Sequence, residues 1–263
     1  MPDLIVRGQI SGWTDLQGEC AATSGDVYII DAEARYAGSL SRKGEFHGIY
    51  KDGDGTPVSC AVSPLNGDLA LTSNGASGGN ILIYPGGVTG SGTSITVPHM
   101  HTYFFDGYDR GGHLWVDGYT ADSKALIGSC TRVHCHTIPI SGGTIFYPGF
   151  LQYASVQKTW YVADRECGGT KRFCIYPVSA SGVLGKAITL TDAHRAPICY
   201  MFQGVITNGG RTVFGGVDNG VYSCGVNSVA RWNIPAGGDP TNRIDLAGGF
   251  PTGAAISFKV GGF

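Results

Sequence analysis

Charged residues are scarce in this chain: they make up 14% of its 263 positions, and the formal net charge is −2. No basic patch stands out, which argues against nucleic acid as a partner. The longest apolar stretches are far shorter than the roughly 18 residues that a membrane-spanning helix needs, so no membrane partner is expected. No phosphate-binding Gly-x-x-x-x-Gly-Lys loop is present either.

Helical signals are also lacking. No segment shows a sustained 3.6-residue apolar period with caps, so almost no helix is predicted and an α/β-hydrolase sheet is excluded. Glycine, in contrast, is abundant at 43 residues, and the glycines separate short apolar runs. Glycine adopts positive φ angles without steric cost, as tight turns between strands require. The composition therefore predicts an all-β fold of many short strands.

A repeat that contains proline divides the chain into units of about 40 to 55 residues. Its copies centre on Pro85, Pro139, Pro177 and Pro235. A second series of β-branched and aromatic strands accompanies these prolines, and four of its five copies end in aspartate. The strands of this series cover residues 26–31, 68–74, 113–117, 159–164 and 212–218. Each unit is therefore expected to hold four strands.

Four-stranded units of this period are typical of β-propeller blades, because one unit alone cannot bury both of its faces. Five full units fit between about residues 17 and 247, and segments 4–10 and 253–258 predict a partial sixth blade formed by the two termini. The whole chain, residues 1–263, is thus expected to be one β-propeller domain. Truncation of the chain, and strands supplied by a partner in a homodimer through the incomplete blade, stay open as alternatives.

Several short segments resemble the NHL-like six-bladed propellers of soil bacteria. The matching segments are 17–20, 57–62, 105–109, 114–118 and 250–254, although the Asn-His-Leu signature itself is absent. The wider group resembles gluconolactonase and paraoxonase-type propellers. That resemblance implies a metal ion in the central channel and hydrolytic activity there.

Carboxylates are the candidate ligands for such a metal. In a propeller, the connections that lead from one blade to the next lie around the same channel mouth as the connections between the second and third strands of each blade. Binding residues concentrate at that mouth. A cluster of oxygen ligands suits Ca²⁺ or Mg²⁺, whereas Zn²⁺ or another transition metal would suit a histidine site. The predicted metal ligands are Glu19, Asp106, Asp164 and Asp218. The alternative is that the aspartates only cap turns by accepting bonds from nearby backbone amides.

Histidines supply the candidate catalytic residues. His99 and His101 lie in the connection before the third blade, and His194 lies in the connection before the fifth. In an extended segment, His99 and His101 would point to one side. With His194 they would form a three-histidine metal site or supply a general base. The alternative is that all three are ordinary loop histidines.

The chain contains eight cysteines, which is many for a cytosolic protein of this size. Disulfides are favoured over free thiols and a metal site for two pairs that lie close in sequence, Cys130 with Cys135 and Cys167 with Cys174. Such bridges predict a secreted or periplasmic protein. Cys20 and Cys60 are expected to be inert core residues, and a cysteine nucleophile is the less favoured interpretation.

These patterns support two hypotheses about function. The favoured one is a hydrolase that uses a divalent metal to polarise an ester, lactone or phosphotriester oxygen at the channel mouth. His194 or His99 would relay protons. The other is a non-catalytic module that binds a small molecule, a carbohydrate or a protein on the same face. A small-molecule substrate or ligand is the principal expected partner.

Overall fold

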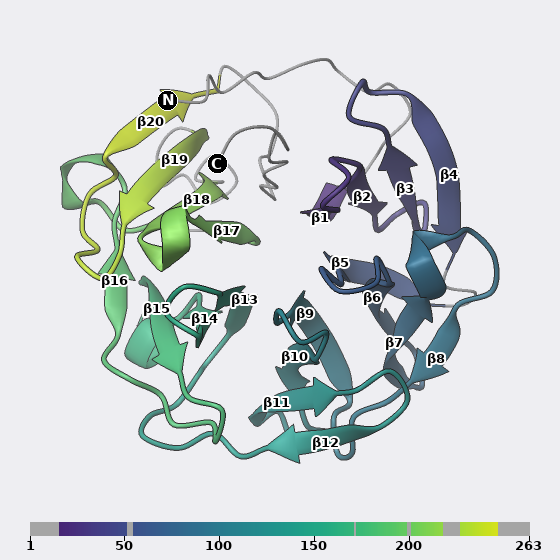
Figure 1. The fold of residues 1–263 in the computed structure, drawn as a ribbon. Coiled ribbons are helices and arrows are strands. Elements are labelled where there is room, and N and C mark those ends of the chain that lie inside the picture. The colour runs from purple at the N-terminus through teal and green to yellow at the C-terminus, as the bar shows by residue number, and fades with distance from the viewer. Residues whose placement is uncertain (1–15, 52–54, 171, 199–200, 218–226, 247–263) are drawn as a thin grey trace.

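The computed structural model describes residues 16–51, 55–170, 172–198, 201–217 and 227–246 (Figure 1). These residues form five antiparallel sheets of four strands each, arranged radially around a centre. Among them, the only helices are four single turns of 3-10 helix. The predicted all-β propeller with five full blades is confirmed. Segments 4–10 and 253–258, from which a sixth blade was predicted, lie outside the described residues.

The strands follow one another through the blades in chain order. Blade 1 contains β1 (Leu16–Ala21), β2 (Val27–Asp31), β3 (Tyr36–Leu40) and β4 (Phe46–Lys51). Blade 2 contains β5 (Thr56–Val62), β6 (Leu69–Gly75), β7 (Gly78–Tyr84), η1 (Pro85–Gly87) and β8 (Thr93–Ile95). Blade 3 contains β9 (Thr102–Tyr108), β10 (Leu114–Tyr119), β11 (Ala125–Cys130) and β12 (Cys135–Ile138).

The last two blades also carry the remaining short helices. Blade 4 contains β13 (Pro148–Ala154), β14 (Thr159–Asp164), η2 (Cys167–Gly169), β15 (Phe173–Val178) and β16 (Ile188–Leu190). The η3 turn (Ala193–Arg195) leads to blade 5, which contains β17 (Gly204–Thr207), η4 (Asn208–Gly210), β18 (Thr212–Val217), β19 (Ser228–Asn233) and β20 (Asn242–Asp245). The innermost strand is the first of each blade: β1, β5, β9, β13 and β17 (Figure 1).

Glycine lets the innermost strands approach one another closely. A Cβ atom added at Gly18 would lie 2.8 Å from the carbonyl oxygen of Val58 in β5, and one at Gly107 would lie 2.7 Å from that of Leu151 in β13. Real Cβ atoms essentially never come this near to backbone. A side chain at either position would therefore push neighbouring blades apart and widen the channel.

Buried apolar side chains fill the space between blades. Trp115 of blade 3 stacks on Trp160 of blade 4, with ring centroids 4.6 Å apart and an interplanar angle of 13°. Polar bonds add to this packing: the Asn74 amide, at the end of β6, accepts from the Tyr103 amide and donates to the Tyr103 carbonyl, both at 2.8 Å. Blade 2 is thereby held to the innermost strand of blade 3.

Three disulfides link the described cysteines. The predicted bridges Cys130–Cys135 and Cys167–Cys174 are confirmed. Cys20 and Cys60 lie in the core as expected, but they also form a third bridge, between β1 and β5, which the sequence did not predict. The two strands are neighbours only in the folded ring, since the cysteines are 40 positions apart in sequence. A bridged pair supplies no thiolate nucleophile.

Candidate site in the central channel

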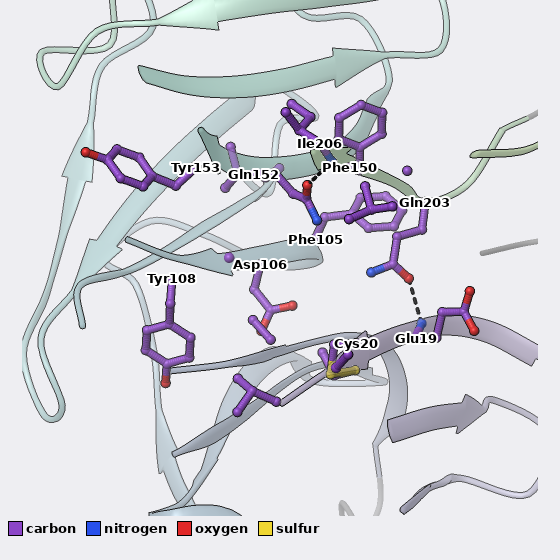
Figure 2. A pocket seen from close by; sticks show the side chains of 18 of the residues that line it. Glu19, Cys20, Phe105, Asp106, Tyr108, Phe150, Gln152, Tyr153, Gln203 and Ile206 are labelled. Atoms are coloured by element: carbon purple, nitrogen blue, oxygen red, sulfur yellow. Dashed lines mark hydrogen bonds between the residues drawn. A yellow bond between two sulfur atoms is a disulfide. The ribbon is translucent and has the colours of Figure 1, made fainter. Parts of the chain in front are cut away.

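A cavity of about 310 Å³ lies in the centre of the ring (Figure 2). Its wall includes residues from the innermost strand of every blade. Thr23 and Pro64, in the β1–β2 and β5–β6 connections, also line it. The cavity therefore lies toward the channel end that carries the first-to-second strand connections. This is the opposite end from the mouth that the sequence predicted as the site.

Asp106 of β9 is the buried ionisable group of this cavity. The residue is 5% exposed, and within the part of the chain that the structure describes neither carboxyl oxygen has a well-formed hydrogen bond. Burial raises the pKa of the Asp106 carboxyl to about 8, and the nearby Ser59 hydroxyl of β5 opposes this rise only in part. Removal from water disfavours the charged form of a carboxyl, so Asp106 is mostly protonated at neutral pH.

Two glutamines place amide nitrogens beside the same space. Gln203, just before β17, accepts from the Glu19 backbone amide at 2.6 Å, and Gln152 of β13 accepts from the Ile206 backbone amide. Because each carbonyl oxygen faces a backbone donor, each NH₂ group is directed the other way. Figure 2 shows these nitrogens and the Asp106 carboxyl directed toward one space. At neutral pH the cavity thus offers several hydrogen-bond donors.

Apolar side chains make up about half of the cavity wall. Phe105, Phe150 and Ile206 line it together with the Cys20–Cys60 bridge. A small cavity in which apolar side chains lie beside a few converging polar groups is the usual form of a small-molecule site. The opposite end of the channel is packed differently, with the Arg165 guanidinium 4.7 Å from the centroid of the Phe202 ring.

The four predicted metal ligands lie in different surroundings. Glu19 and Asp106 both line the cavity, but the Glu19 carboxylate points away from Asp106 in Figure 2. Asp164 lies outside the cavity wall, at the end of β14, and Asp218 lies outside the described residues. The Asp164 carboxylate accepts bonds from three backbone amides, at 3.1, 2.9 and 3.0 Å. It therefore caps the connections around it, as the alternative interpretation proposed.

The three predicted catalytic histidines are exposed; His99 and His101 lie in the β8–β9 connection, and His194 lies in the connection before blade 5. His99 has a φ angle of 66°, so the segment is not extended and the predicted alternation with His101 does not hold. The His101 amide donates to the Tyr119 carbonyl at 2.7 Å, at the channel end away from the cavity. His194 lies in η3 before blade 5. The structure does not bring the three imidazoles to the cavity.

Within the residues that the structure describes, no three His, Cys, Asp or Glu side chains are close enough to hold a metal ion. Asp106 is a single carboxyl, and the carbonyl oxygens of Gln152 and Gln203 already accept from backbone amides. Calcium takes six to eight oxygen ligands. The donor set of the described cavity does not fit the predicted Ca²⁺ or Zn²⁺.

Sequence reasoning missed one buried carboxyl of this region as a site residue. Asp117 of β10 is 1% exposed, and its Oδ1 accepts from the Phe105 amide at 2.8 Å. Burial raises the pKa of Asp117 well above its ordinary value. Its place at the end of a second strand looked the same in sequence as those of Asp31 and Asp164. In the structure it faces Phe104 and Phe105, next to the pair of Val116 with Asp106, and no signal in the sequence marked it out.

Comparison with known proteins supports the fold. The sequence matches no family model and no curated protein. Its structure is similar to a chain of a nidogen/laminin complex, with 14% identity, a TM-score of 0.69 and coverage of 92% of this chain and 85% of that one. The calcium-binding protein regucalcin from Agrobacterium tumefaciens is 14% identical, with a TM-score of 0.62 and coverage of 94% of this chain and 79% of that one. Virginiamycin B lyase from Staphylococcus aureus is 13% identical, with a TM-score of 0.59 and coverage of 93% of this chain and 75% of that one.

The chain shares the β-propeller fold with these proteins. Regucalcin-like and lyase-type propellers among them agree with the resemblance drawn from the sequence at the level of fold. At such low identity the likeness says nothing about residues of the site, because one fold carries many functions.

Proposed function

We propose that this protein hydrolyses a small ester, lactone or phosphotriester in the central cavity, with Asp106 as the proton donor. The observation that supports the proposal is a buried carboxyl that faces a cavity, lacks a partner among the described residues and has a pKa of about 8. A general acid works best when its pKa is near the working pH. Strongly shifted carboxyls in clefts are frequent catalytic groups.

The geometry suggests a division of roles for an ester or lactone. The Gln152 and Gln203 NH₂ groups donate to the carbonyl oxygen and stabilise the charge that develops there. Water adds to the carbonyl carbon, and the Asp106 proton passes to the departing alkoxide oxygen. The proton lost by the water then restores the Asp106 carboxyl. Burial of Asp106 lowers the local dielectric and strengthens these interactions.

Metal assistance is a separate prediction, and no step of the proposed acid mechanism uses a metal. One similar protein is a calcium-binding regucalcin, but the described cavity here lacks a fitting donor set. Metal content of the purified protein, followed by turnover before and after chelation, tests the prediction. Loss of turnover on chelation would implicate ligands such as Glu19 and Asp218, and His99, His101 and His194 would then be tested in turn.

The test of the acid mechanism is a panel of aryl esters, lactones and phosphotriesters assayed with the wild type and Asp106→Asn. We expect Asp106→Asn to lower kcat by about 10²–10⁴-fold, because asparagine carries no transferable proton. Wild-type kcat/KM should fall as pH rises above about 8, where Asp106 loses its proton. Asp122→Asn, at an exposed carboxylate paired with Lys124, is the matched control and should retain activity.

A binding module is the second candidate, and one feature favours it: the two glutamine amides are fixed by backbone bonds beside an apolar wall. In that case the panel would give no turnover, while calorimetry would detect binding of the intact esters or lactones. Gln203→Ala would weaken such binding. Turnover that Asp106→Asn leaves unchanged would contradict the proposed acid.

The three disulfides fit an extracellular or periplasmic location, because such compartments allow disulfides to form and persist. We propose that the protein is exported, and fractionation of the source cells tests this. No helix in the described part of the chain is long and apolar enough to cross a membrane. Assembly into a homodimer through the predicted sixth blade stays a prediction, and light scattering of the purified protein tests it.

A further inference from the structure

The strand that carries Asp106 contains a β-bulge directly before it. Phe104 and Phe105 of β9 together stand opposite the single residue Asp117 of β10, while Asp106 pairs with Val116. A bulge adds one residue to a strand and redirects the side chains that follow. The direction of the Asp106 carboxyl therefore depends on how this bulge is held.

Two side chains hold the peptide group between Phe104 and Phe105. Its N–H donates to Asp117 Oδ1 at 2.8 Å, from the neighbouring strand of the same blade. Its carbonyl accepts from the Thr72 hydroxyl at 2.6 Å, from β6 of the adjacent blade. Both polar groups that the bulge removes from the strand ladder are thus bonded. The Phe104–Phe105 peptide, one residue before Asp106, is therefore held from two sides.

The neighbouring blades show that such a bulge does not require a carboxyl. In blade 2 the equivalent amide, that of Ser59, donates to the Thr72 hydroxyl at 3.1 Å. In blade 4, Gly149 and Phe150 stand opposite Ala163, which has no polar side chain. Blade 2 thus has a hydroxyl at this position and blade 4 a methyl group. In blade 3 the bulge faces a buried carboxyl, and Asp106 follows it directly.

Asp117 and Asp106 also interact electrostatically. Burial is the main cause that raises the pKa of Asp117, ionisation of Asp106 raises it further, and Arg165, in the β14–β15 connection, lowers it. Burial is the main cause that raises the pKa of Tyr119, at the end of β10; the charge of Asp117 raises this pKa further and that of Arg165 lowers it. In the described part of the chain, Asp106, Arg165 and Tyr119 are thus titratable groups coupled to Asp117.

We propose that Asp117 is a positioning residue that holds the bulge before Asp106 and so directs the Asp106 carboxyl into the cavity. Its importance for turnover rests on the function proposed above. Its effect on Asp106, however, exists in the free protein. The two ideas can therefore fail separately.

The test compares Asp117→Thr with Asp117→Val. The two replacements have nearly the same shape, but only threonine offers the bulge amide a hydroxyl acceptor, as Thr72 does in blade 2. The readout is the Asp106 titration in protein with ¹³C-labelled aspartate carboxyls, followed by NMR without substrate. Asp106→Asn identifies the Asp106 signal.

We expect Asp117→Thr to keep the Asp106 titration near that of the wild type. Asp117→Val should lower the Asp106 pKa by about one unit or more, because a released bulge lets the carboxyl turn toward water. Where turnover is measurable, Asp117→Val should lower kcat with little change in KM. Asp31→Val, at a buried aspartate of blade 1, controls for general loosening and should leave Asp106 unchanged.

Equal Asp106 titrations in Asp117→Thr and Asp117→Val would overturn the proposal. An equal fall of the Asp106 pKa in Asp31→Val would overturn it as well, since the effect would then be unspecific. If Asp117→Val does not fold, the Asp106 titration of Asp117→Thr is compared with that of the wild type. An altered titration in Asp117→Thr would count against the proposal. Absence of hydrolysis in every protein, with the expected titrations, would refute the proposed function and leave this inference standing.

Discussion

Replacement of Asp106 by asparagine should change how stability depends on pH. The folded state holds the Asp106 carboxyl with a pKa of about 8, against 3.8 for an ordinary aspartate. Between these two values the folded protein binds a proton that the unfolded chain releases. The contribution of Asp106 is therefore fully present below pH 3.8 and is lost as pH rises to about 8.

The size of the effect follows from linkage. One bound proton changes the free energy of unfolding by at most about 1.4 kcal/mol per pH unit. From pH 5 to pH 7 the wild type should thus lose up to about 3 kcal/mol relative to Asp106→Asn. Asparagine has no such proton to hold. The buried Asp117 is present in both proteins, so its own contribution largely cancels in the comparison.

The assay is urea unfolding of both proteins at pH 5, 6, 7 and 8 with the disulfides intact. The difference in free energy of unfolding should change steadily in favour of Asp106→Asn as pH rises. Asp122→Asn, at an exposed carboxylate, should follow the wild-type profile at these pH values. Parallel profiles for the wild type and Asp106→Asn would mean that Asp106 titrates as an ordinary aspartate, and the general-acid argument would fail with it.

Three further predictions concern the bonds between blades. The double variant Cys20→Ala/Cys60→Ala should lower the free energy of unfolding by about 2–4 kcal/mol, because the bridge spans 40 positions; an unchanged urea midpoint would contradict this. Asn74→Ala should cost about 2 kcal/mol by the same measurement, because the variant loses both side-chain bonds to the Tyr103 backbone; a cost below the error of the method would show that water replaces them. Trp160→Leu should cost about 3 kcal/mol and weaken the near-ultraviolet circular dichroism of the stacked pair, whereas an unaltered spectrum would argue against stacking in solution.

Much of the fold could be predicted because its signals are local. Strand 159–164 carries its β-branched and aromatic residues within six positions, and its hairpin partner follows directly in sequence. The short bridges Cys130–Cys135 and Cys167–Cys174 were predictable for the same reason, since each closes a loop of a few residues. Blade order needs no further information, because each blade consists of consecutive strands.

The site depended on contacts between blades, which the sequence pattern does not contain. The sequence pattern aligned Asp117 with Asp164, yet Asp164 ends β14 and meets three backbone amides, whereas Asp117 lies within β10 and meets the amide of a bulge. The partner of Cys20 is 40 positions away. A single extra residue in a strand changes which side chains face a channel, because strand side chains alternate. The sequence by itself determined the blades and their order, and the tertiary structure decided that Asp106 faces the cavity.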